Sequence, residues 1–297
     1  MSQPPKIAGI GELLWDQFPD GSRLGGAPVN FAYHCHQLGS EAYPVSSIGK
    51  DEEGLRTRKK LNELGLSDRY ITESASLPTG KVLVNLDSQG KPSYQILENV
   101  AWDELAFTED LSRLAASLDA VCFGVLARRS EQNRSTIARF IAGMPTEAHK
   151  VCDVNLREPF YSRERVEGAL QLATILKLSD EELPVLAGYF DLAGEVPEQL
   201  AALRQRFSLT HVAYTRGGDG SLILTADEID ECGGFPTKLV DTVGAGDSFT
   251  ASLVFGILNQ WPIHEVNRYA NQIASYVCSQ KGATPRIPDE LIQAPVS

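Results

Sequence analysis

The residues best suited to chemistry lie together at positions 241–249, whose sequence is DTVGAGDSF. Gly244, Ala245 and Gly246 are small and stand at the entrance to a stretch with the pattern of a long helix. Such an entrance exposes backbone N–H groups at the positive end of the helix dipole, where they stabilise the negative charge of phosphoryl transfer. Asp247 follows directly and is placed to accept a proton from an attacking hydroxyl. The segment therefore predicts an anion hole with a general base beside it.

This glycine-rich segment differs from the two best-known nucleotide motifs. It lacks the GxxxxGK[ST] pattern of a P-loop and the GxGxxG pattern of a dinucleotide-binding turn. Taken alone, it also fits a plain helix entrance in which Asp247 is a first-turn acid stabilised by the dipole. The rest of the chain has to decide between these two interpretations.

The composition is that of a folded globular protein. The chain has 297 residues, of which 42% are hydrophobic and 22% are charged. Its formal net charge of −12 makes a nucleic-acid backbone an unfavourable partner. No apolar run approaches the roughly eighteen residues that a membrane helix needs, and the first residues lack the pattern of a secretory signal. We therefore expect a cytoplasmic protein with no membrane and no nucleic-acid partner.

Short apolar runs alternate along the chain with helical patterns, which is typical of a mainly parallel sheet covered by helices. The expected strands cover residues 6–11, 42–49, 120–124, 150–156 and 173–179, with a strand–turn–strand unit at 211–224. The principal expected helices cover residues 29–39, 51–65, 245–260 and 263–282. No repeat, low-complexity tract or linker interrupts this order, so we interpret residues 1–297 as a single α/β domain with a small lid.

Residues 79–99 break this alternation. They read as two strands joined by a turn at residues 88–90, and the first strand alternates with a period of two. A hairpin inside an α/β protein is either a lid over the active site or a surface β-arm without a catalytic role, and the pattern leaves both open. If the hairpin projects as an open arm, one face needs cover that a second copy can supply, so we expect a homodimer.

The motifs resemble those of the ribokinase-like (PfkB) sugar kinases, and within that family those of the fructokinases. GGAPVNFA at 25–32 looks like the family's N-terminal signature, and DTVGAGDSF at 241–249 matches its C-terminal signature. Similar segments fall between them in the expected order: ENVAWDEL at 98–105, CFGVLARRS at 122–130, CDVNLREPFYS at 152–162, KLSDEEL at 177–183 and TRGGDGSL at 215–222. The resemblance implies a three-layer ribokinase-like fold, a mainly parallel sheet flanked by helices, with lid segments near 12–30 and 79–103.

The same resemblance implies an enzyme that transfers the γ-phosphate of ATP to a small sugar, with D-fructose as the expected acceptor. Asp247 corresponds to the family's catalytic base, which takes the proton of the sugar hydroxyl. The backbone N–H groups of Gly244, Ala245 and Gly246 would form the anion hole that faces the transferred phosphoryl group.

For the acceptor, the resemblance implies a set of polar groups around the sugar. Asp16 resembles the acid that holds sugar hydroxyls, and Gly25, Gly26 and Asn30 lie where the family brings backbone and an amide against the sugar. Arg157 resembles an arginine found near the sugar and the phosphate. Carboxylate and amide groups suit vicinal hydroxyls, because each can make paired hydrogen bonds.

For the nucleotide, the resemblance implies a second group of residues. Thr215, Gly217 and Gly220 resemble the turn beneath the ATP phosphates, and Lys177 resembles a phosphate contact. Asn271 lies in the closing helix, where the family lines the adenine pocket.

ATP and Mg²⁺ are therefore the expected cofactors. Glu182 resembles the acid that meets Mg²⁺ through water, but Ser179 stands where most members have Asn, which puts this part of the site in doubt. Asp241 and Val243, with residues 282–284, resemble a monovalent-cation site, and K⁺ is an additional candidate ion.

Three functions remain open on the sequence. The first is a fructokinase, and the second is a kinase for another sugar or for a sugar acid of the 2-keto-3-deoxygluconate type. A sugar acid would need a dedicated cation for its carboxylate, so an Arg or Lys beyond Arg157 in the pocket would favour it. The third is a sugar-binding sensor without catalysis, which the intact Asp247 disfavours and Ser179 favours.

Three further features have ordinary interpretations. Arg128 and Arg129 are candidates for binding phosphate, but two exposed arginines after a predicted strand more often belong to a solvated turn. The run RTRKK at 56–60 reads as the wet face of a helix and less readily as a phosphate-binding patch. Trp102 either stacks on a substrate or anchors the lid to the core, and the sequence leaves both open.

Overall fold

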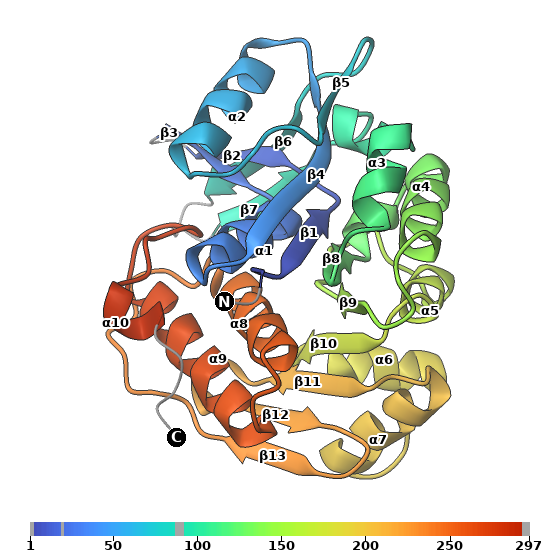
Figure 1. The fold of residues 1–297 in the computed structure, drawn as a ribbon, viewed down its shortest axis with the longest axis vertical. Helices are drawn as coiled ribbons and strands as arrows, with labels where there is room; N and C mark the ends of the chain where they lie inside the picture. The colour runs from blue at the N-terminus through green and yellow to red at the C-terminus, as the bar shows by residue number, and fades with distance from the viewer. Residues whose placement is uncertain (1–2, 19–20, 87–91, 293–297) are drawn as a thin grey trace.

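Two β-sheets organise the computed structural model, which describes residues 3–18, 21–86 and 92–292 (Figure 1). The larger sheet has nine strands, in the spatial order β13 (Ile229–Cys232), β12 (Ser221–Leu224), β11 (His211–Thr215), β10 (Ile175–Ser179), β9 (His149–Asp153), β8 (Ala120–Gly124), β1 (Lys6–Ile10), β4 (Glu41–Gly49) and β5 (Ile71–Ser74). All strands from β11 to β5 run parallel, whereas β12 and β13 are antiparallel additions at one edge. The carboxyl ends of the parallel strands therefore meet at one side of the sheet.

Helices cover both faces of this sheet. One layer contains α1 (Ala27–Gln37), α8 (Ala245–Leu258) and α9 (Ile263–Cys278). The other contains α3 (Glu109–Ala115), α4 (Glu131–Ala142), α5 (Arg163–Leu170), α6 (Leu183–Phe190) and α7 (Val196–Arg206). Successive residues of a strand point to opposite faces, so Ile7 packs in the first layer and Ala8 and Ile10 pack in the second. These two buried cores confirm the predicted three-layer α/β fold.

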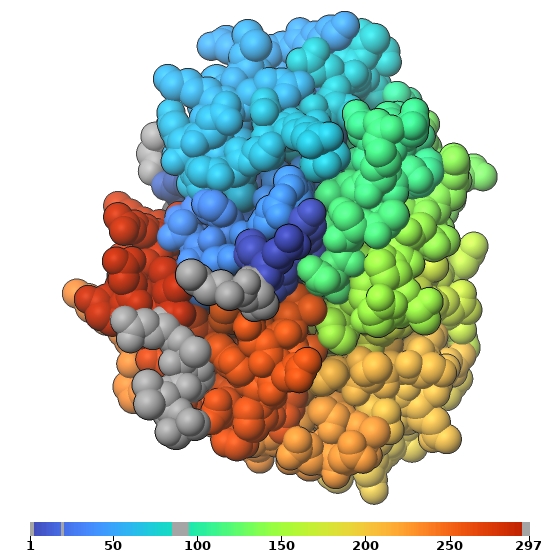
Figure 2. Space-filling model, in the orientation of Figure 1, coloured from blue at the N-terminus to red at the C-terminus, as the bar shows by residue number. Residues whose placement is uncertain are grey.

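The N-terminal and C-terminal parts of the chain lie side by side. Helix α1 packs against α8, and Figure 2 shows the N-terminal segments in contact with the C-terminal helices on the same face. His34 of α1 adds a polar contact, since its Nε2 lies 2.8 Å from the backbone oxygen of Ala283. The two signature segments, 25–32 and 241–249, are brought together by this packing.

A second, four-stranded sheet has the order β3 (Gly21–Gly25), β2 (Leu14–Phe18), β6 (Gly80–Leu86) and β7 (Pro92–Ile96). Strands β6 and β7 are the two antiparallel strands expected at 79–99, and the turn predicted at residues 88–90 lies outside the described residues. The hairpin of β2 and β3 falls within the expected lid segment 12–30, although neither strand has a clear alternating pattern.

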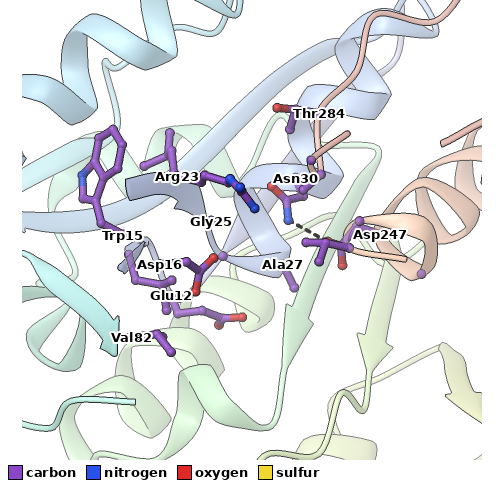
Figure 3. A pocket seen from close by; sticks show the side chains of 18 of the residues that line it. Glu12, Trp15, Asp16, Arg23, Gly25, Ala27, Asn30, Val82, Asp247 and Thr284 are labelled. Carbon is purple, nitrogen blue, oxygen red and sulfur yellow. Dashed lines mark hydrogen bonds between the residues drawn. The ribbon is translucent and has the colours of Figure 1, made fainter. Parts of the chain in front are cut away.

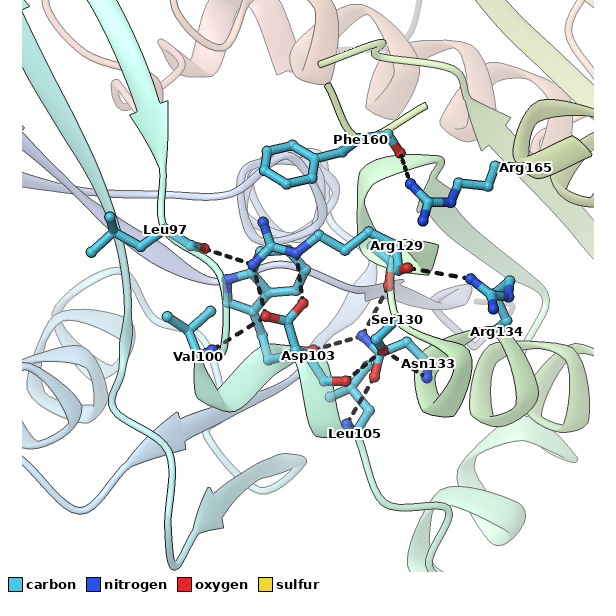
Figure 4. Close-up of polar contacts among 12 residues, drawn as sticks. Leu97, Val100, Asp103, Leu105, Arg129, Ser130, Asn133, Arg134, Phe160 and Arg165 are labelled. Atoms are coloured by element: carbon cyan, nitrogen blue, oxygen red, sulfur yellow. Dashed lines mark hydrogen bonds and ion pairs between the residues drawn. The ribbon is translucent and has the colours of Figure 1, made fainter. Parts of the chain in front are cut away.

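A buried ionic junction connects this small sheet, which we call the lid sheet, to the main body. Arg129 donates from Nε and Nη2 to the two carboxylate oxygens of Asp103, both at 2.7 Å, and Nη2 also donates to the backbone oxygen of Leu97 at 2.6 Å (Figure 4). The guanidinium stacks 4.0 Å from the ring centre of Trp102 and 4.6 Å from that of Phe160. Asp103 and Trp102 belong to the 3-10 helix η1 (Ala101–Glu104), which follows β7.

The junction corrects the solvated turn predicted for Arg128 and Arg129. Arg128 ends the 3-10 helix η2 (Leu126–Arg128) and Arg129 follows it; they are 6% and 7% exposed, and η1 with its aromatic side chain covers Arg129. Trp102 is fully buried and packs beneath Arg129, which supports its reading as an anchor of the lid.

The remaining helices complete the fold. Helix α2 (Glu52–Glu63) follows β4, η3 (Gly217–Asp219) lies between β11 and β12, and α10 (Asp289–Ile292) is near the C-terminus. Within the described ranges, no helix combines the length and apolar character needed to cross a bilayer.

Candidate active site

A cavity of about 910 Å³ opens beside the carboxyl ends of the parallel strands, between the lid sheet and the start of α8. Its walls come from β2, β3, α1, α2 and α8 and from the loops around residues 153–157, 241–244 and 282–284. Figure 3 shows the acidic side chains of Asp16 and Asp247 on opposite sides of this space, with Asn30 near Asp247. The cavity thus gathers residues from both ends of the chain.

The residues predicted to form an anion hole, Gly244, Ala245 and Gly246 (the anion-hole segment), lie at the N-terminus of α8. The sequence predicts a helix beginning at this point. Gly244 is the N-cap and has φ 81°, a left-handed conformation that glycine adopts without strain. A side chain at this position would collide with the backbone oxygen of Ala283. Gly244 and Gly246 both line the cavity, and Ala245 is the first helical residue between them. The first N–H groups of α8 therefore lie at the cavity wall.

Asp247 lies in the first turn of α8 and is bonded to α1. Asn30 Nδ2 donates a 2.8 Å hydrogen bond to Asp247 Oδ2 (Figure 3). Burial and the negative charge of Asp153 together raise the pKa of Asp247 to about 6, although the bond from Asn30 and the charges of Lys177 and Arg157 oppose the increase. At neutral pH the carboxylate is mostly ionised, yet it is basic enough to accept a proton.

A buried ion pair lies directly beneath the anion-hole segment. Lys177 Nζ is 3.2 Å from Asp153 Oδ1, and Thr250 of α8 donates a 3.0 Å hydrogen bond to Asp153 Oδ2. A Cβ atom built on Gly246 would be 3.1 Å from Lys177 Nζ, which places the ammonium against the backbone of the helix entrance. Burial lowers the pKa of Lys177, but the charges of Asp153 and Glu182 outweigh it and raise the pKa above its ordinary value.

Asp153 is a site residue that the sequence analysis did not single out. The strand expected at 150–156 ends earlier, at Asp153; Val154 still donates to the backbone oxygen of Lys177, and the chain turns at Asn155, which has φ 41°. An acid at the carboxyl end of a central parallel strand is the signal that would have indicated it, because ligands bind outside these strand ends.

The predicted acceptor residues lie on the lid side of the same cavity. Asp16 comes from β2, Gly25 ends β3, and Gly26 is the N-cap of α1. Burial raises the pKa of Asp16 to about 6, and the charges of Arg157 and Arg23 oppose this effect. Arg157 lies in the loop after β9, is exposed and lines the cavity. The structure therefore brings all the predicted acceptor residues to one space with Asp247.

Glu12 is a second acid that the sequence analysis did not identify. It follows β1 at the junction with the lid sheet, lines the cavity and is 3% exposed. Burial raises its pKa to about 7, and Asp247 contributes to the increase, while N–H groups of Glu12 and Ala27 and the charge of Arg157 oppose it. No motif marks this residue, because GELL is an unremarkable sequence after a strand.

The predicted nucleotide residues Thr215, Gly217 and Gly220 lie outside the residues that line the cavity. They stand at the end of β11 and in the turn around η3, beside the carboxyl end of β10. A Cβ atom on Gly217 would meet nothing within 4 Å, so the backbone there is open to close approach by a ligand. A Cβ atom on Gly220 would instead collide with the backbone oxygen of Cys232.

Asn271 and Glu182 are held by other residues of the protein. Asn271 Nδ2 donates to Ser221 Oγ at 2.6 Å and to the side-chain and backbone oxygens of Asn267. Glu182 Oε1 accepts from the backbone N–H of Leu156 at 2.9 Å, and Oε2 accepts from that of Ser179 at 2.7 Å. Neither residue lines the cavity, and Ser179 meets Glu182 through its backbone N–H.

Asp241 and Val243 lie at the cavity wall next to the loop of residues 282–284. Asp241 Oδ1 accepts from the backbone N–H of Val243 at 3.1 Å, and Oδ2 accepts from that of Gly282 at 3.0 Å. The acid therefore joins the segment before α8 to the segment after α9. Across the described parts of the chain, no group of three or more His, Cys, Asp or Glu side chains is arranged to hold a metal ion.

Additional cations reach the cavity from α2. Arg56, Lys59 and Lys60 line it, so the run expected as a wet helix face also borders the site. Arg56 stacks 4.3 Å from the ring centre of Trp15, and its Nη2 donates to Ser22 Oγ at 2.8 Å. The condition set for an anionic acceptor, a cation beyond Arg157 in the pocket, is met by these side chains.

Comparisons with known proteins agree on one family. A model of the pfkB family carbohydrate kinases matches residues 16–290. The chain is 31% identical over 264 residues to a fructokinase of Klebsiella pneumoniae, covering 85% of this chain and 84% of the relative. It is 26% identical over 304 residues to a fructokinase of Escherichia coli, covering 95% and 96% of the two chains.

Solved structures show the same architecture. A fructokinase of Xylella fastidiosa with bound ATP superposes with a TM-score of 0.84 at 21% identity and covers 95% of each chain. A fructokinase of Vibrio cholerae with fructose, ADP and calcium ion bound gives a TM-score of 0.82 at 24% identity and covers 97% of each chain. At these identities the structural likeness establishes only the ribokinase-type fold. Membership in the family is shown by the family model, which matches residues 16–290.

Proposed function

Since the chain belongs to the pfkB family of carbohydrate kinases, we propose that it is an ATP-dependent fructokinase. The observation that carries the proposal is the position of Asp247 at the start of α8, bonded to Asn30 in the cavity that also contains Asp16. A general base, a row of helix N-terminal N–H groups and an acid suited to sugar hydroxyls share one space. Phosphoryl transfer to a sugar needs these three elements together.

The chemistry assigns one role to each group. Asp247 accepts the proton of the sugar hydroxyl as its oxygen attacks the γ-phosphorus of ATP, the bond from that phosphorus to the bridging oxygen breaks, and ADP leaves. The N–H groups of Gly244, Ala245 and Gly246 stabilise the negative charge on the transferred group. Lys177, held by Asp153 beneath the helix entrance, adds a fixed positive charge on the same side.

The sugar is bound on the lid side in this proposal. Asp16 accepts hydrogen bonds from sugar hydroxyls, and Asn30, Gly25 and Gly26 approach it from the segment that ends β3 and begins α1. Arg157 lines the cavity, its charge acts on both carboxylates, and its guanidinium steadies the transferred phosphate. Closure of the lid sheet over the sugar would exclude water from the reacting atoms.

The nucleotide extends from the anion hole along the carboxyl ends of β10 and β11. Thr215, Gly217 and Gly220 form the turn beneath the phosphates, and Asn271 borders the adenine. Gly217 supports this placement, because its backbone is open to close approach.

Mg²⁺ and K⁺ complete the proposal. A hydrated Mg²⁺ bound mainly by ATP phosphates would neutralise charge on the transferred group. Glu182 fits its water shell, since each carboxylate oxygen holds one backbone N–H and keeps a free lone pair. A K⁺ ion would use oxygens near Asp241 and Val243.

A coupled assay of ADP release with ATP and magnesium across a panel of sugars tests the function. Turnover with D-fructose and weak turnover with other sugars is the expected result. Turnover with only a different sugar would change the identity of the acceptor and leave the proposed mechanism unchanged. Sugar binding without any consumption of ATP would instead establish a non-catalytic sensor.

A sugar that carries an anionic group, of the 2-keto-3-deoxygluconate type, is the second candidate acceptor. Arg56, Lys59 and Lys60 favour it because they border the cavity and supply the positive charge that a carboxylate needs. Comparing kcat/KM for fructose and for 2-keto-3-deoxygluconate in wild type and in Lys59→Ala decides between the two. A selective loss with the acid would support the second candidate.

The proposal includes a homodimer in the cytoplasm, where ATP is available. The outer strands β3 and β7 of the lid sheet each leave one edge for a second copy. Light scattering at micromolar concentration tests this, and a monomeric mass would contradict it.

A further inference from the structure

Glu12 occupies a special place between the two sheets. It lies two residues after the end of β1 at Ile10 and two residues before β2 begins at Leu14, where the chain passes from the main sheet to the lid sheet. Its side chain is 3% exposed and lines the cavity. Figure 3 shows the carboxyls of Glu12, Asp16 and Asp247 directed toward the same part of this space.

One oxygen of the Glu12 carboxyl lacks a partner. The backbone N–H groups of Glu12 itself and of Ala27, at the start of α1, lie close enough to the carboxyl to lower its pKa somewhat. Its Oε2 is buried and has no hydrogen-bond partner among the residues that the structure describes. Buried polar atoms are nearly always hydrogen-bonded, and an unpaired one calls for an explanation. A ligand oxygen in the adjoining cavity would supply the missing partner.

Burial and the negative charge of Asp247 favour the neutral form of Glu12, whereas the positive charge of Arg157 opposes it. Asp247 from α8 and Arg157 from the loop after β9 face it, and Asp16 lies nearby on β2. Burial raises the pKa of Glu12 to about 7, above those of Asp16 and Asp247 at about 6. Glu12 therefore keeps its proton to a higher pH than a glutamate in water does.

A neutral carboxyl provides what the two aspartates lack. Ionised Asp16 and Asp247 only accept hydrogen bonds, so they suit the O–H groups of a sugar. A ring or carbonyl oxygen of a sugar has no proton and needs a donor. Resting on the proposed function, we infer that Glu12 is a further acceptor-binding residue, whose protonated carboxyl donates a hydrogen bond from Oε2 to an oxygen of the bound sugar.

A purely structural role for Glu12 would give different behaviour. Gly26, the N-cap of α1, has no side chain, and the backbone N–H of Ala27 lies near the Glu12 carboxyl, so a structural role for Glu12 would be support of the helix start. Such support would affect thermal stability without linking sugar affinity to the proton of Glu12. The Glu12→Gln variant separates the roles, because its amide keeps an acceptor for Ala27 and a donor for the sugar but does not titrate.

The test is calorimetric titration, without ATP, of the sugar that gives the highest turnover in the panel, from pH 5.5 to 8.5. The dissociation constant of wild type should rise by up to about tenfold per pH unit above pH 7, because Glu12 loses its proton there. Glu12→Gln should bind with nearly constant affinity from pH 7 to 8.5. Glu12→Ala, which removes the donor, should bind at least about tenfold more weakly at pH 6.

Glu228→Gln is the matched control, since it removes one carboxylate in an exposed turn between β12 and β13 and should titrate like wild type. Circular dichroism verifies that each variant is folded. A wild-type affinity that stays constant above pH 7 would overturn the inference, and so would a Glu12→Gln variant that follows the wild-type pH profile. Turnover of fructose in the panel assay would leave the proposed function intact in either case. If no sugar binds to the wild-type protein at all, both the inference about Glu12 and the proposed function fail.

Discussion

Asn30 Nδ2 and Asp247 Oδ2 form a 2.8 Å hydrogen bond between residues 217 positions apart. The bond joins α1, which begins beside the lid sheet, to α8, whose N-terminus forms the anion-hole segment. It fixes the direction of the Asp247 carboxylate and presents that group to any sugar held near Asn30. The orientation of the proposed base is therefore set by a residue of the acceptor site.

Replacing Asp247 by Asn should remove the general base and leave most acceptor contacts in place. We expect kcat to fall by about 10²–10⁴-fold, with the affinity for the sugar changed by only a few-fold. Steady-state kinetics and sugar titration measure the two quantities. Wild-type kcat in this variant would show that another group takes the proton.

The Asn30→Ala variant should shift the pH dependence of kcat. The bond from Asn30 favours ionised Asp247 and lowers its pKa, so removing it raises the pKa above its present value of about 6. The acid limb of the kcat profile should therefore move to higher pH, with the largest loss near pH 6. Asn259→Ala, at the exposed end of α8, is the control and should keep the wild-type profile.

The Asp153→Asn variant should act on stability and on pH dependence together. It leaves the Lys177 ammonium buried without its partner, which should cost about 3–5 kcal/mol in urea unfolding at pH 7.5. It also removes a like charge that raises the pKa of Asp247, so that pKa should fall and the acid limb of kcat should move to lower pH.

The double variant Asp153→Asn with Lys177→Met serves as its control, because it removes both charges. It should be more stable than the single variant at Asp153. If the unfolding free energy of Asp153→Asn lies within about 1 kcal/mol of the wild-type value, the buried ion pair does not matter for stability.

The Arg129→Lys variant tests the junction beneath the lid sheet. Lysine cannot make the paired bonds to Asp103 or stack as a plane on Trp102, so we expect a loss of about 2–4 kcal/mol in unfolding free energy. A looser lid should also raise the KM for the sugar more than it lowers kcat. Arg113→Lys is the matched control, because Arg113 pairs with Glu109 and Asp110 on an exposed helix, and it should cost at most about 1 kcal/mol.

Local signals in the sequence anticipate much of this protein. The alternation of apolar strands and helical patterns predicts the parallel sheet and its two helix layers, because side-chain periodicity depends on neighbours along the chain. The small residues before Asp247 predict the start of α8. The structure agrees, because Gly244 is the N-cap and takes the left-handed conformation that glycine adopts readily. The β6–β7 hairpin follows from its alternating pattern and its turn-forming residues.

Other features depend on contacts between distant segments, which local patterns do not encode. Arg129 looks like a surface residue in sequence, yet η1 brings Asp103 and Trp102 over it and buries it. The cations of α2 reach the cavity because the helix packs near Trp15 of β2. Similarly, Asp153 acquires its partner because β9 and β10 are neighbours in the sheet.

The sequence by itself therefore determined the alternation of strands and helices, the fold class and the helix entrance that carries Asp247, because each depends on the order of neighbouring residues. The tertiary structure alone decided that Asn30 orients Asp247, that Lys177 lies beneath Gly246 and that Glu12 is buried at the cavity wall. These relationships fix the ionisation of the carboxyl groups, since a pKa depends on burial and nearby charge and these arise only when the chain folds.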